Sequence, residues 1–292
     1  MWTVGVDLGS ESVKIVCLAK KKNEYRLISY GLFHREHPEL IRETLQHPNL
    51  KRANIRVALK DSMVKIRKLE LPPAPPEDLD QMVKMAMSQN LPEPIASYIL
   101  RYQPEQKIVL ISEKKQIDEY LLELRQFGIV NPAILEPNSN TLVHAALYNH
   151  PLSNNQRYAI VDIGHSAARF SVVSEYGLVF GRNLSEASGA DLLALQNADA
   201  KTALMQWLYK VAIEIQNSIE NYQIQFPGVQ VGELLLTGGI SKFQGLSAYV
   251  QDTLKIKTGF LKAFQKINTS GFPHVLFEDL EQNYATAIGL AL

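Results

Sequence analysis

The feature that most constrains the fold is a pattern of apolar run, turn and apolar run that occurs twice. Residues 4–16 read VGVDLGSESVKIV, and residues 158–173 read YAIVDIGHSAARFSVV, with an Asp-x-Gly turn in each. Each copy predicts a strand, a tight loop and a strand, and a third strand is expected after each copy, at 25–33 and 178–183. One duplication of this length indicates two similar lobes, because a solenoid needs several short repeats.

The first turn gathers chemical groups that suit a phosphate. A carboxylate, two hydroxyls and an ammonium crowd around one glycine, at Asp7, Gly9, Ser10, Ser12 and Lys14. Backbone N–H groups and hydroxyls can hold phosphate oxygens, the lysine can neutralise charge, and the aspartate can orient Mg²⁺ through its waters. An ordinary surface hairpin with polar turn residues is the alternative for this stretch taken alone.

The second turn supplies a partner for the first. Asp162, Gly164 and Ser166 occupy the same kind of strand-loop-strand setting. Two such turns that face each other across a cleft could hold a polyphosphate from both sides, with Asp7 and Asp162 flanking one Mg²⁺ through water. Recurrence in the same context favours this shared site over a chance repeat.

A third element follows the second hairpin, at residues 233–246. Its pattern predicts a buried strand, a double glycine and the start of a helix. Gly238 and Gly239 leave room for a flat ring or a ribose, and Ser241 is placed to cap a helix whose N-terminal amides attract a phosphate. It matches neither the Walker A loop nor G-x-G-x-x-G. A tight strand-to-helix turn without a ligand is the alternative.

The composition is that of an ordinary globular protein and excludes several classes. The 292 residues are formally neutral and 46% hydrophobic, so no electrostatic footprint for nucleic acid is present. The single cysteine, Cys17, allows no intramolecular disulfide and is expected to be a buried, inert thiol. No apolar stretch approaches the roughly 18 residues of a membrane span. These observations predict a cytoplasmic protein.

Together with Glu136-Pro137, the helix predicted after it, and the closing segment at 283–292, these motifs resemble the phosphate, adenosine and connecting motifs of the actin, heat-shock chaperone and sugar kinase superfamily. Within it the chain most resembles the PilM family, the actin-like proteins of type IV pilus assembly. The resemblance implies a two-lobed α/β actin-like ATPase fold with ribonuclease H-like lobes. Lobe 1 would span 1–155 with an inserted 1C-type subdomain at about 34–105. Lobe 2, with a reduced 2B subdomain, would span 156–272, and 273–292 would return to lobe 1.

The resemblance also implies ligands and partners. ATP and Mg²⁺ would be held by the residues named above. A helix is predicted at 203–222, with Trp207, Val211 and Ile215 among its inward positions. Its Glu214 would be a ribose ligand, although a solvated helix-face charge is an equal alternative. The cytoplasmic N-terminal tail of a bitopic, PilN-like inner-membrane protein would dock between the inserted 1C subdomain and the rest of lobe 1 (subdomain 1A), in a type IV pilus or type II secretion platform. Self-association is also possible, and the protein would be peripheral to the membrane through this partner.

Departures from the family pattern concern hydrolysis. Ala167, Ala168 and Arg169 follow Ser166 where the family usually offers further hydroxyls, so the protein is expected to be at most a slow ATPase. No catalytic residue is identified; Glu136 is the one weak candidate. A sugar-type kinase of the same superfamily and an FtsA-like division protein are the alternatives. The kinase needs an acceptor pocket with an aspartate base, and FtsA-like chains usually continue beyond the point where this sequence stops.

Overall fold

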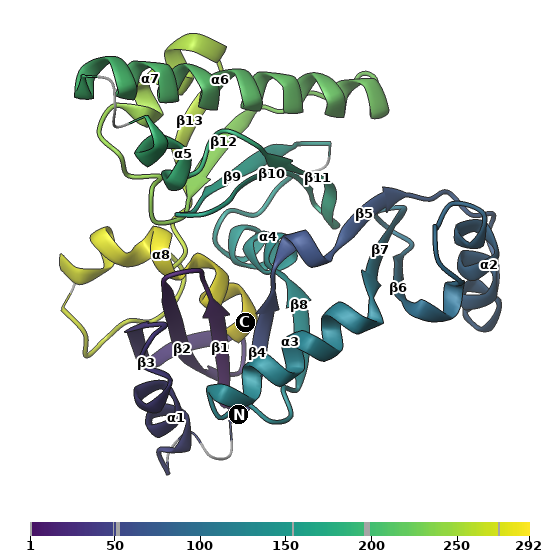
Figure 1. Cartoon of the computed structure of the whole chain (residues 1–292), viewed down its shortest axis with the longest axis horizontal. Helices are drawn as coiled ribbons and strands as arrows, with labels where there is room; N and C mark the ends of the chain where they lie inside the picture. Colours follow the sequence, from purple (N-terminus) through teal and green to yellow (C-terminus); the bar gives the residue numbers. More distant parts are fainter. Residues whose placement is uncertain (1, 49, 51–52, 154, 196–198, 274) are drawn as a thin grey trace.

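The computed structural model describes residues 2–48, 50, 53–153, 155–195, 199–273 and 275–292. Its first five-stranded sheet has the order β3-β2-β1-β4-β8 (Figure 1). The antiparallel strands β1, β2 and β3 come first in the chain, and β4 and β8 add in parallel. The elements of this sheet and its outer helices are β1 (Trp2–Leu8), β2 (Ser12–Lys21), β3 (Glu24–His34), α1 (Pro38–Gln46), β4 (Asn54–Leu59), α3 (Lys114–Gln126) and β8 (Ile134–Pro137).

The second five-stranded sheet repeats this topology, with the order β11-β10-β9-β12-β13. Again three antiparallel strands come first, and two strands add in parallel to the first of them. Its elements are β9 (Tyr158–Ile163), β10 (Ala168–Ser174), β11 (Gly177–Leu184), α5 (Gly189–Ala194), α6 (Ala200–Gln225), β12 (Glu233–Thr237), α7 (Leu246–Leu254) and β13 (Lys257–Phe260). The predicted duplication into two α/β lobes is therefore confirmed. Between β11 and α6 the described residues form only the short helix α5, as expected for a reduced 2B subdomain.

A small three-stranded sheet, β5-β7-β6, extends to one side of the first lobe (Figure 1). It comprises η1 (Asp61–Met63), β5 (Lys65–Lys68), α2 (Pro76–Ser88), η2 (Ile95–Ser97), β6 (Tyr98–Gln103) and β7 (Ile108–Glu113). The expected range of 34–105 does not follow these sheets, because β4 pairs with β1 in the large sheet and β7 lies in the small one. We propose bounds near Asp61 and Glu113 for the inserted subdomain.

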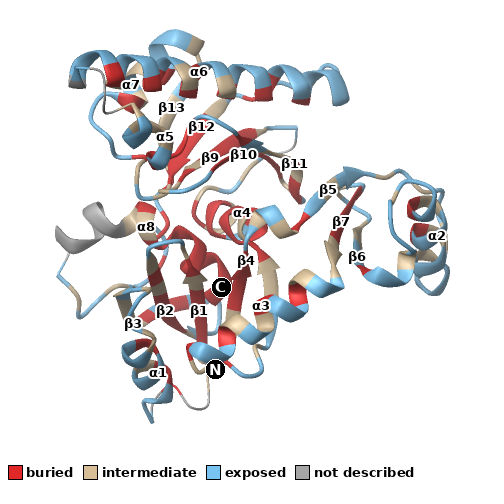
Figure 2. Ribbon diagram, viewed as in Figure 1, coloured by how far each residue is buried: buried red, intermediate tan, exposed pale blue. Residues whose placement is uncertain are grey.

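Helices α4 (Asn138–Asn149) and α8 (Val275–Ala291) lie between the two large sheets. One hydrophobic cluster joins α4 and α8 to strands of both sheets, for example Leu18 of β2, Ile160 of β9 and Ile288 of α8. Helices α1 and α3 cover the outer face of the first sheet, and α6 and α7 cover the outer face of the second. Figure 2 shows the resulting layers of buried residues, with the exposed face of α6 turned outward.

The burial pattern follows the sequence in the predicted helices and strands. On α6 the expected inward positions Trp207, Val211 and Ile215 are fully buried. Cys17 is buried in β2, and this burial raises the pKa of its thiol to about 11, so the thiol is not a nucleophile. None of the helices in the described part of the chain combines the length and apolar composition that a membrane crossing requires.

Candidate functional site

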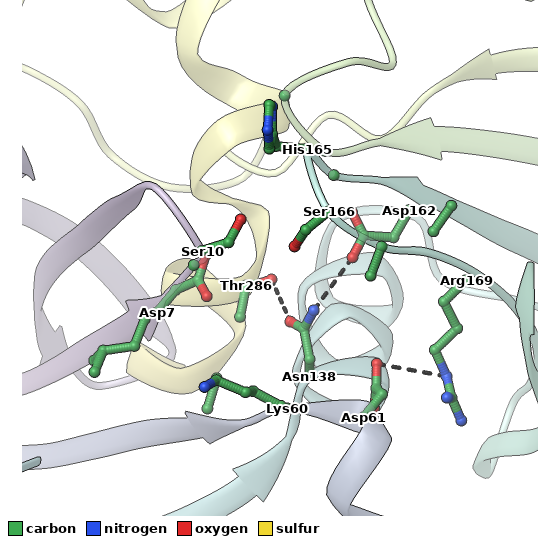
Figure 3. A pocket seen from close by; sticks show the side chains of 18 of the residues that line it. Asp7, Ser10, Lys60, Asp61, Asn138, Asp162, His165, Ser166, Arg169 and Thr286 are labelled. Atoms are coloured by element: carbon green, nitrogen blue, oxygen red, sulfur yellow. Dashed lines mark hydrogen bonds and ion pairs between the residues drawn. The ribbon is translucent and has the colours of Figure 1, made fainter. Parts of the chain in front are cut away.

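A cleft of about 930 Å³ opens between the two large sheets, where the loops after β1 and β9 meet. Figure 3 shows Asp7 and Ser10 on one side, Asp162 and Ser166 on the other, and Asn138 and Thr286 between them. Ten of the predicted site residues line this cleft: Asp7, Gly9, Ser10, Ser12, Lys14, Asp162, Gly164, Ser166, Gly238 and Gly239. The fold thus brings the three predicted motifs to one place.

The two Asp-x-Gly loops have the same backbone turn. Gly9 N–H donates to the carbonyl of Ser12 at 3.0 Å, and Gly164 N–H donates to the carbonyl of Ala167 at 2.9 Å. A Cβ on Gly9 would lie 2.8 Å from the Ser12 carbonyl oxygen, so a side chain cannot be accommodated there. Each turn leaves its polar side chains at the cleft, because the glycine lets the strand reverse closely.

The two aspartates differ in their partners. Asp7 lies 3.6 Å from Lys14 Nζ, its neighbour on β2. Asp162 instead accepts a hydrogen bond from Asn138 Nδ2 at 3.2 Å, and Thr286 Oγ1 donates to Asn138 Oδ1 at 2.6 Å. The start of α4 and the middle of α8 therefore hold the lobe 2 aspartate in position.

Negative charge accumulates around these carboxylates. Burial, together with the charges of Asp7 and Asp61, raises the pKa of Asp162 to about 7, while Lys14 and the Asn138 hydrogen bond act in the opposite direction. Burial also raises the pKa of Asp7, partly offset by Lys14. Two buried carboxyls that disfavour each other's ionised form are chemically suited to a divalent cation, which would remove that repulsion.

The Thr-Gly-Gly turn after β12 packs directly on the second aspartate. Gly238 has φ +90°, and a Cβ there would lie 2.5 Å from Asp162 Oδ1 and from the Ile163 carbonyl oxygen. Ile240 N–H donates to the same carbonyl at 3.0 Å. Only glycine satisfies both the dihedral angle and the contact at this position.

Ser241 does not cap a helix, and this part of the prediction is wrong. Helix α7 begins at Leu246 after Gly245, and Ser241 Oγ donates to the carbonyl of Gly238 at 2.7 Å. Ser241 is fully buried and is not among the described residues that line the cleft. Its hydroxyl stabilises the turn that presents Gly238 and Gly239. The predicted cap fails because the chain makes further turns before it enters α7.

Glu214 and Glu136 also lie away from the described lining of the cleft. Glu214 accepts a hydrogen bond from Ser185 Oγ at 2.8 Å and lies 3.4 Å from Arg182, on the outer side of β11. Glu136 turns toward α4, where Asn140 Nδ2 donates to it at 3.0 Å. The expected roles as ribose ligand and catalytic base therefore receive no geometric support, since tertiary packing directs both side chains elsewhere.

Several cleft residues were not predicted from the sequence. Asp61 Oδ2 lies 3.5 Å from Arg169 Nε, and Glu11 Oε1 lies 3.1 Å from His165 Nε2, so two ion-pair contacts join the lobes. Lys60 also lines the cleft, and burial together with nearby Arg35 lowers its pKa. Asn138 and Thr286 stood within segments identified as connecting motifs, and that position was the available signal for them. Asp61 lies outside every motif and had none.

Comparisons with known proteins agree with this geometry. Residues 194–292, about a third of the chain, match the family model described as "Type IV pilus assembly protein PilM". A solved PilM-PilN type IV pilus biogenesis complex contains a chain with TM-score 0.83 and 19% identity, and the match covers 99% of this chain and 97% of that one. The resemblance to the PilM family is confirmed.

Other solved structures share the fold at a greater distance. A Bacteroides thetaiotaomicron protein described as having an actin-like ATPase fold and unknown function matches with TM-score 0.50 and 11% identity, over 100% of this chain and 96% of that one. The activator of 2-hydroxyisocaproyl-CoA dehydratase from Clostridium difficile, with bound ADPNP, matches with TM-score 0.51 and 10% identity, over 100% and 93%. No curated protein sequence matches the chain. The two-lobed actin-like fold is thus shown, as the PilM-like resemblance implied.

Proposed function

We propose that this chain is an actin-like, nucleotide-binding adaptor of a type IV pilus or type II secretion platform. It binds ATP with Mg²⁺ in the cleft and docks the cytoplasmic tail of a PilN-like inner-membrane protein. The observation that carries the proposal is the similarity of the whole chain to PilM in the PilM-PilN complex, at TM-score 0.83. It acts at the cytoplasmic face of the membrane through that partner.

The cleft residues fit a magnesium nucleotide. The first loop offers Gly9, Ser10, Ser12 and Lys14 to phosphates, and the second offers Gly164 and Ser166 from the opposite wall. Asp7 and Asp162 would hold Mg²⁺ through its waters, and the cation would offset the charges of Asp7 and Asp61, which add to burial in raising the pKa of Asp162. The backbone of Gly238 and Gly239 lines the cleft and would face the adenosine. The ion would neutralise the phosphates and bridge them to the protein.

Nucleotide binding is tested by calorimetry with Asp7→Ala, because Asp7 lies at the centre of the proposed site. We expect the variant to bind ATP-Mg²⁺ at least about tenfold more weakly, which corresponds to about 1.4 kcal/mol. Asp118→Ala, on the exposed face of α3, is the matched control and leaves affinity unchanged. Equal affinity in the Asp7 variant and the wild type rejects the site. Incubation with ATP and a panel of sugars separates this function from a kinase, which would release phosphorylated product.

Helix α3 leads the chain from the inserted subdomain back to lobe 1, whereas β4 leads into that subdomain through η1. It starts immediately after β7, and at its other end the carbonyl of Gln126 accepts a hydrogen bond from Arg42 of α1 at 2.8 Å. Its outward side carries Leu122, which is 59% exposed. We assign Leu122 as a contact of an extended tail that docks between these two units.

Partner docking is tested with immobilised N-terminal tails of membrane proteins encoded beside this chain, with and without ATP-Mg²⁺. We expect the wild type to be captured by one such tail and Leu122→Arg to lose at least about tenfold in affinity, because a charge replaces an apolar contact. Ile224→Arg, at the end of α6 in lobe 2 and 76% exposed, is the control and binds normally. Failure of every tail to capture the wild type under either condition rejects the docking.

A further inference from the structure

A row of four polar side chains crosses the second sheet at the edge of the cleft. In the strand register Thr237 is opposite Asp162, Asp162 is opposite Arg169, and Arg169 is opposite Asn183. Directly opposite residues project from the same face of a sheet, and all four line the cleft. Arg169 is therefore part of the lobe 2 wall, and its guanidinium lies beside Asp61 and Asn183 (Figure 3).

The aspartate–cation pair of this row is repeated in lobe 1, with a lysine in place of the arginine. Asp7 is opposite Lys14, just as Asp162 is opposite Arg169, and in each hairpin the cation follows its aspartate by seven residues. Lys14 and Arg169 are thus equivalent under the internal duplication. Arg169, which stands where the family usually offers a hydroxyl, places a cation in the lobe 2 wall of the cleft.

The Arg169 side chain is held by buried contacts, yet not all of its N–H donors make hydrogen bonds. Its side chain is only 9% exposed, and Nη1 donates to Asn183 Oδ1 at 2.7 Å. Nε lies 3.5 Å from Asp61 Oδ2 and makes no hydrogen bond within the described part of the chain. Gly181 makes room for the guanidinium, because a Cβ there would lie 2.7 Å from Nη2.

Asp61 is itself fixed, which keeps Arg169 at the cleft. Its Oδ1 accepts hydrogen bonds from the N–H and the hydroxyl of Ser139, at 3.1 and 2.8 Å, and so caps the start of α4 from a distant part of the chain. The carboxylate neutralises Arg169 in the buried wall when no anion is near. A phosphate that enters the cleft offers the guanidinium a more highly charged, bidentate partner.

We propose that Arg169 binds the terminal phosphate of a nucleoside triphosphate and makes the cleft prefer ATP to ADP. This inference rests on the proposed nucleotide binding and assigns the lobe 2 contact that the missing hydroxyls would have made. Lys14 and Arg169 neutralise the polyphosphate from opposite walls, and Arg169 exchanges its weak contact with the Asp61 carboxylate for the phosphate.

The test is calorimetric titration with ATP-Mg²⁺ and ADP-Mg²⁺ of the wild type, Arg169→Ala and Arg169→Lys. We expect Arg169→Ala to lose about tenfold to a hundredfold in ATP affinity, the range of a charge-assisted hydrogen bond, and less than about threefold for ADP. Arg169→Lys keeps part of the ATP preference, because lysine keeps the positive charge but lacks the paired N–H donors of a guanidinium. Arg182→Ala, an arginine of β11 paired with Glu214 outside the cleft, changes neither affinity.

Two outcomes overturn the inference separately from the proposed function. If the wild type binds ATP and Arg169→Ala has the same ratio of ATP affinity to ADP affinity as the wild type, Arg169 has no role in the preference. The nucleotide site itself then stands. A wild type that binds neither nucleotide rejects both. Because Arg169→Ala leaves Asp61 without a cation, Asp61→Asn/Arg169→Ala is the second variant. This double variant is expected to have the free energy of unfolding of the wild type and still to lack the ATP preference. Recovery of that preference contradicts the proposal.

Discussion

Asn138 of α4 donates a hydrogen bond to Asp162 of β9 across the two lobes, with 3.2 Å between Nδ2 and Oδ2. Thr286 of α8 orients the same amide by donating to its oxygen at 2.6 Å. This chain of contacts links the middle layer of helices to the second phosphate loop. The position of Asp162 therefore depends on how α4 and α8 pack between the sheets.

The raised pKa of Asp162 predicts how stability changes with pH. The folded chain keeps a proton on this carboxyl up to about pH 7, whereas the unfolded chain releases it near the ordinary value of 3.8. The contribution of the protonated group is therefore present below about pH 4 and is lost as the pH rises through about 7. We expect Asp162→Asn, which cannot ionise, to gain stability relative to the wild type over this range, by at most about 4 kcal/mol.

Urea denaturation of both proteins at several pH values between about 5 and 8 measures this difference. Asp118→Asn, on the exposed side of α3, is the control and is expected to give a curve parallel to the wild type. A constant difference between Asp162→Asn and the wild type over the whole range contradicts the raised pKa.

Asn138→Ala is expected to destabilise the protein by about 1–3 kcal/mol, because it leaves Thr286 and Asp162 without their shared partner. It is also expected to weaken ATP binding, since Asp162 loses its fixed orientation. Thermal unfolding and calorimetry measure the two effects. Asn221→Ala, whose amide bonds only within the exposed surface of α6, should change neither; equal behaviour of the two variants would contradict the role of Asn138.

Gly238→Ala and Gly245→Ala separate dihedral strain from a steric clash. Both glycines have positive φ, +90° and +88°, so each substitution costs about 1–2 kcal/mol for the left-handed conformation. Only at Gly238 would the Cβ also meet Asp162 and the Ile163 carbonyl, while at Gly245 nothing lies within 4 Å. We expect Gly238→Ala to be clearly less stable and to lose nucleotide binding, and Gly245→Ala to bind normally.

Gly289 is the contact point between α8 and α4. A Cβ at this position would lie 1.8 Å from the Thr141 carbonyl oxygen, so Gly289→Ala would force the two helices apart. We expect a loss of about 3 kcal/mol in the free energy of unfolding, measured with urea. Gly259→Ala in β13 meets nothing within 4 Å and is expected to change stability by less than about 1 kcal/mol. Similar losses in both variants would disprove close helix packing at Gly289.

The elements of the fold were predictable because their signals are local. The alternation of apolar residues and the Asp-x-Gly turns indicated β1, β2, β9 and β10, and the spacing of Trp207, Val211 and Ile215 indicated the buried face of α6. The duplication of the hairpin also indicated the two lobes. A side chain on a strand or helix has a direction set by the element's own period, so no tertiary information is needed to place it on a face.

The content of the cleft was predictable only in part. The residues of the three glycine turns meet as expected, because each turn lies at the same end of its sheet. Ser241, Glu214 and Glu136 were misplaced, since the extra turns before α7 and the polar partners near β11 and α4 are tertiary features. The sheet register in turn made Arg169 the counterpart of Lys14, although the sequence indicated only missing hydroxyls.

The sequence by itself determined the duplicated strand-loop-strand units, their glycine turns and the two aspartates, because steric and hydrophobic preferences act between near neighbours in the chain. Only the tertiary structure decided which charges meet across the lobes. Asp61 and Arg169, like Glu11 and His165, lie far apart in sequence and approach because α4 and α8 hold the two sheets face to face. Electrostatic contacts of that kind depend on distance and burial, and neither is encoded in local spacing.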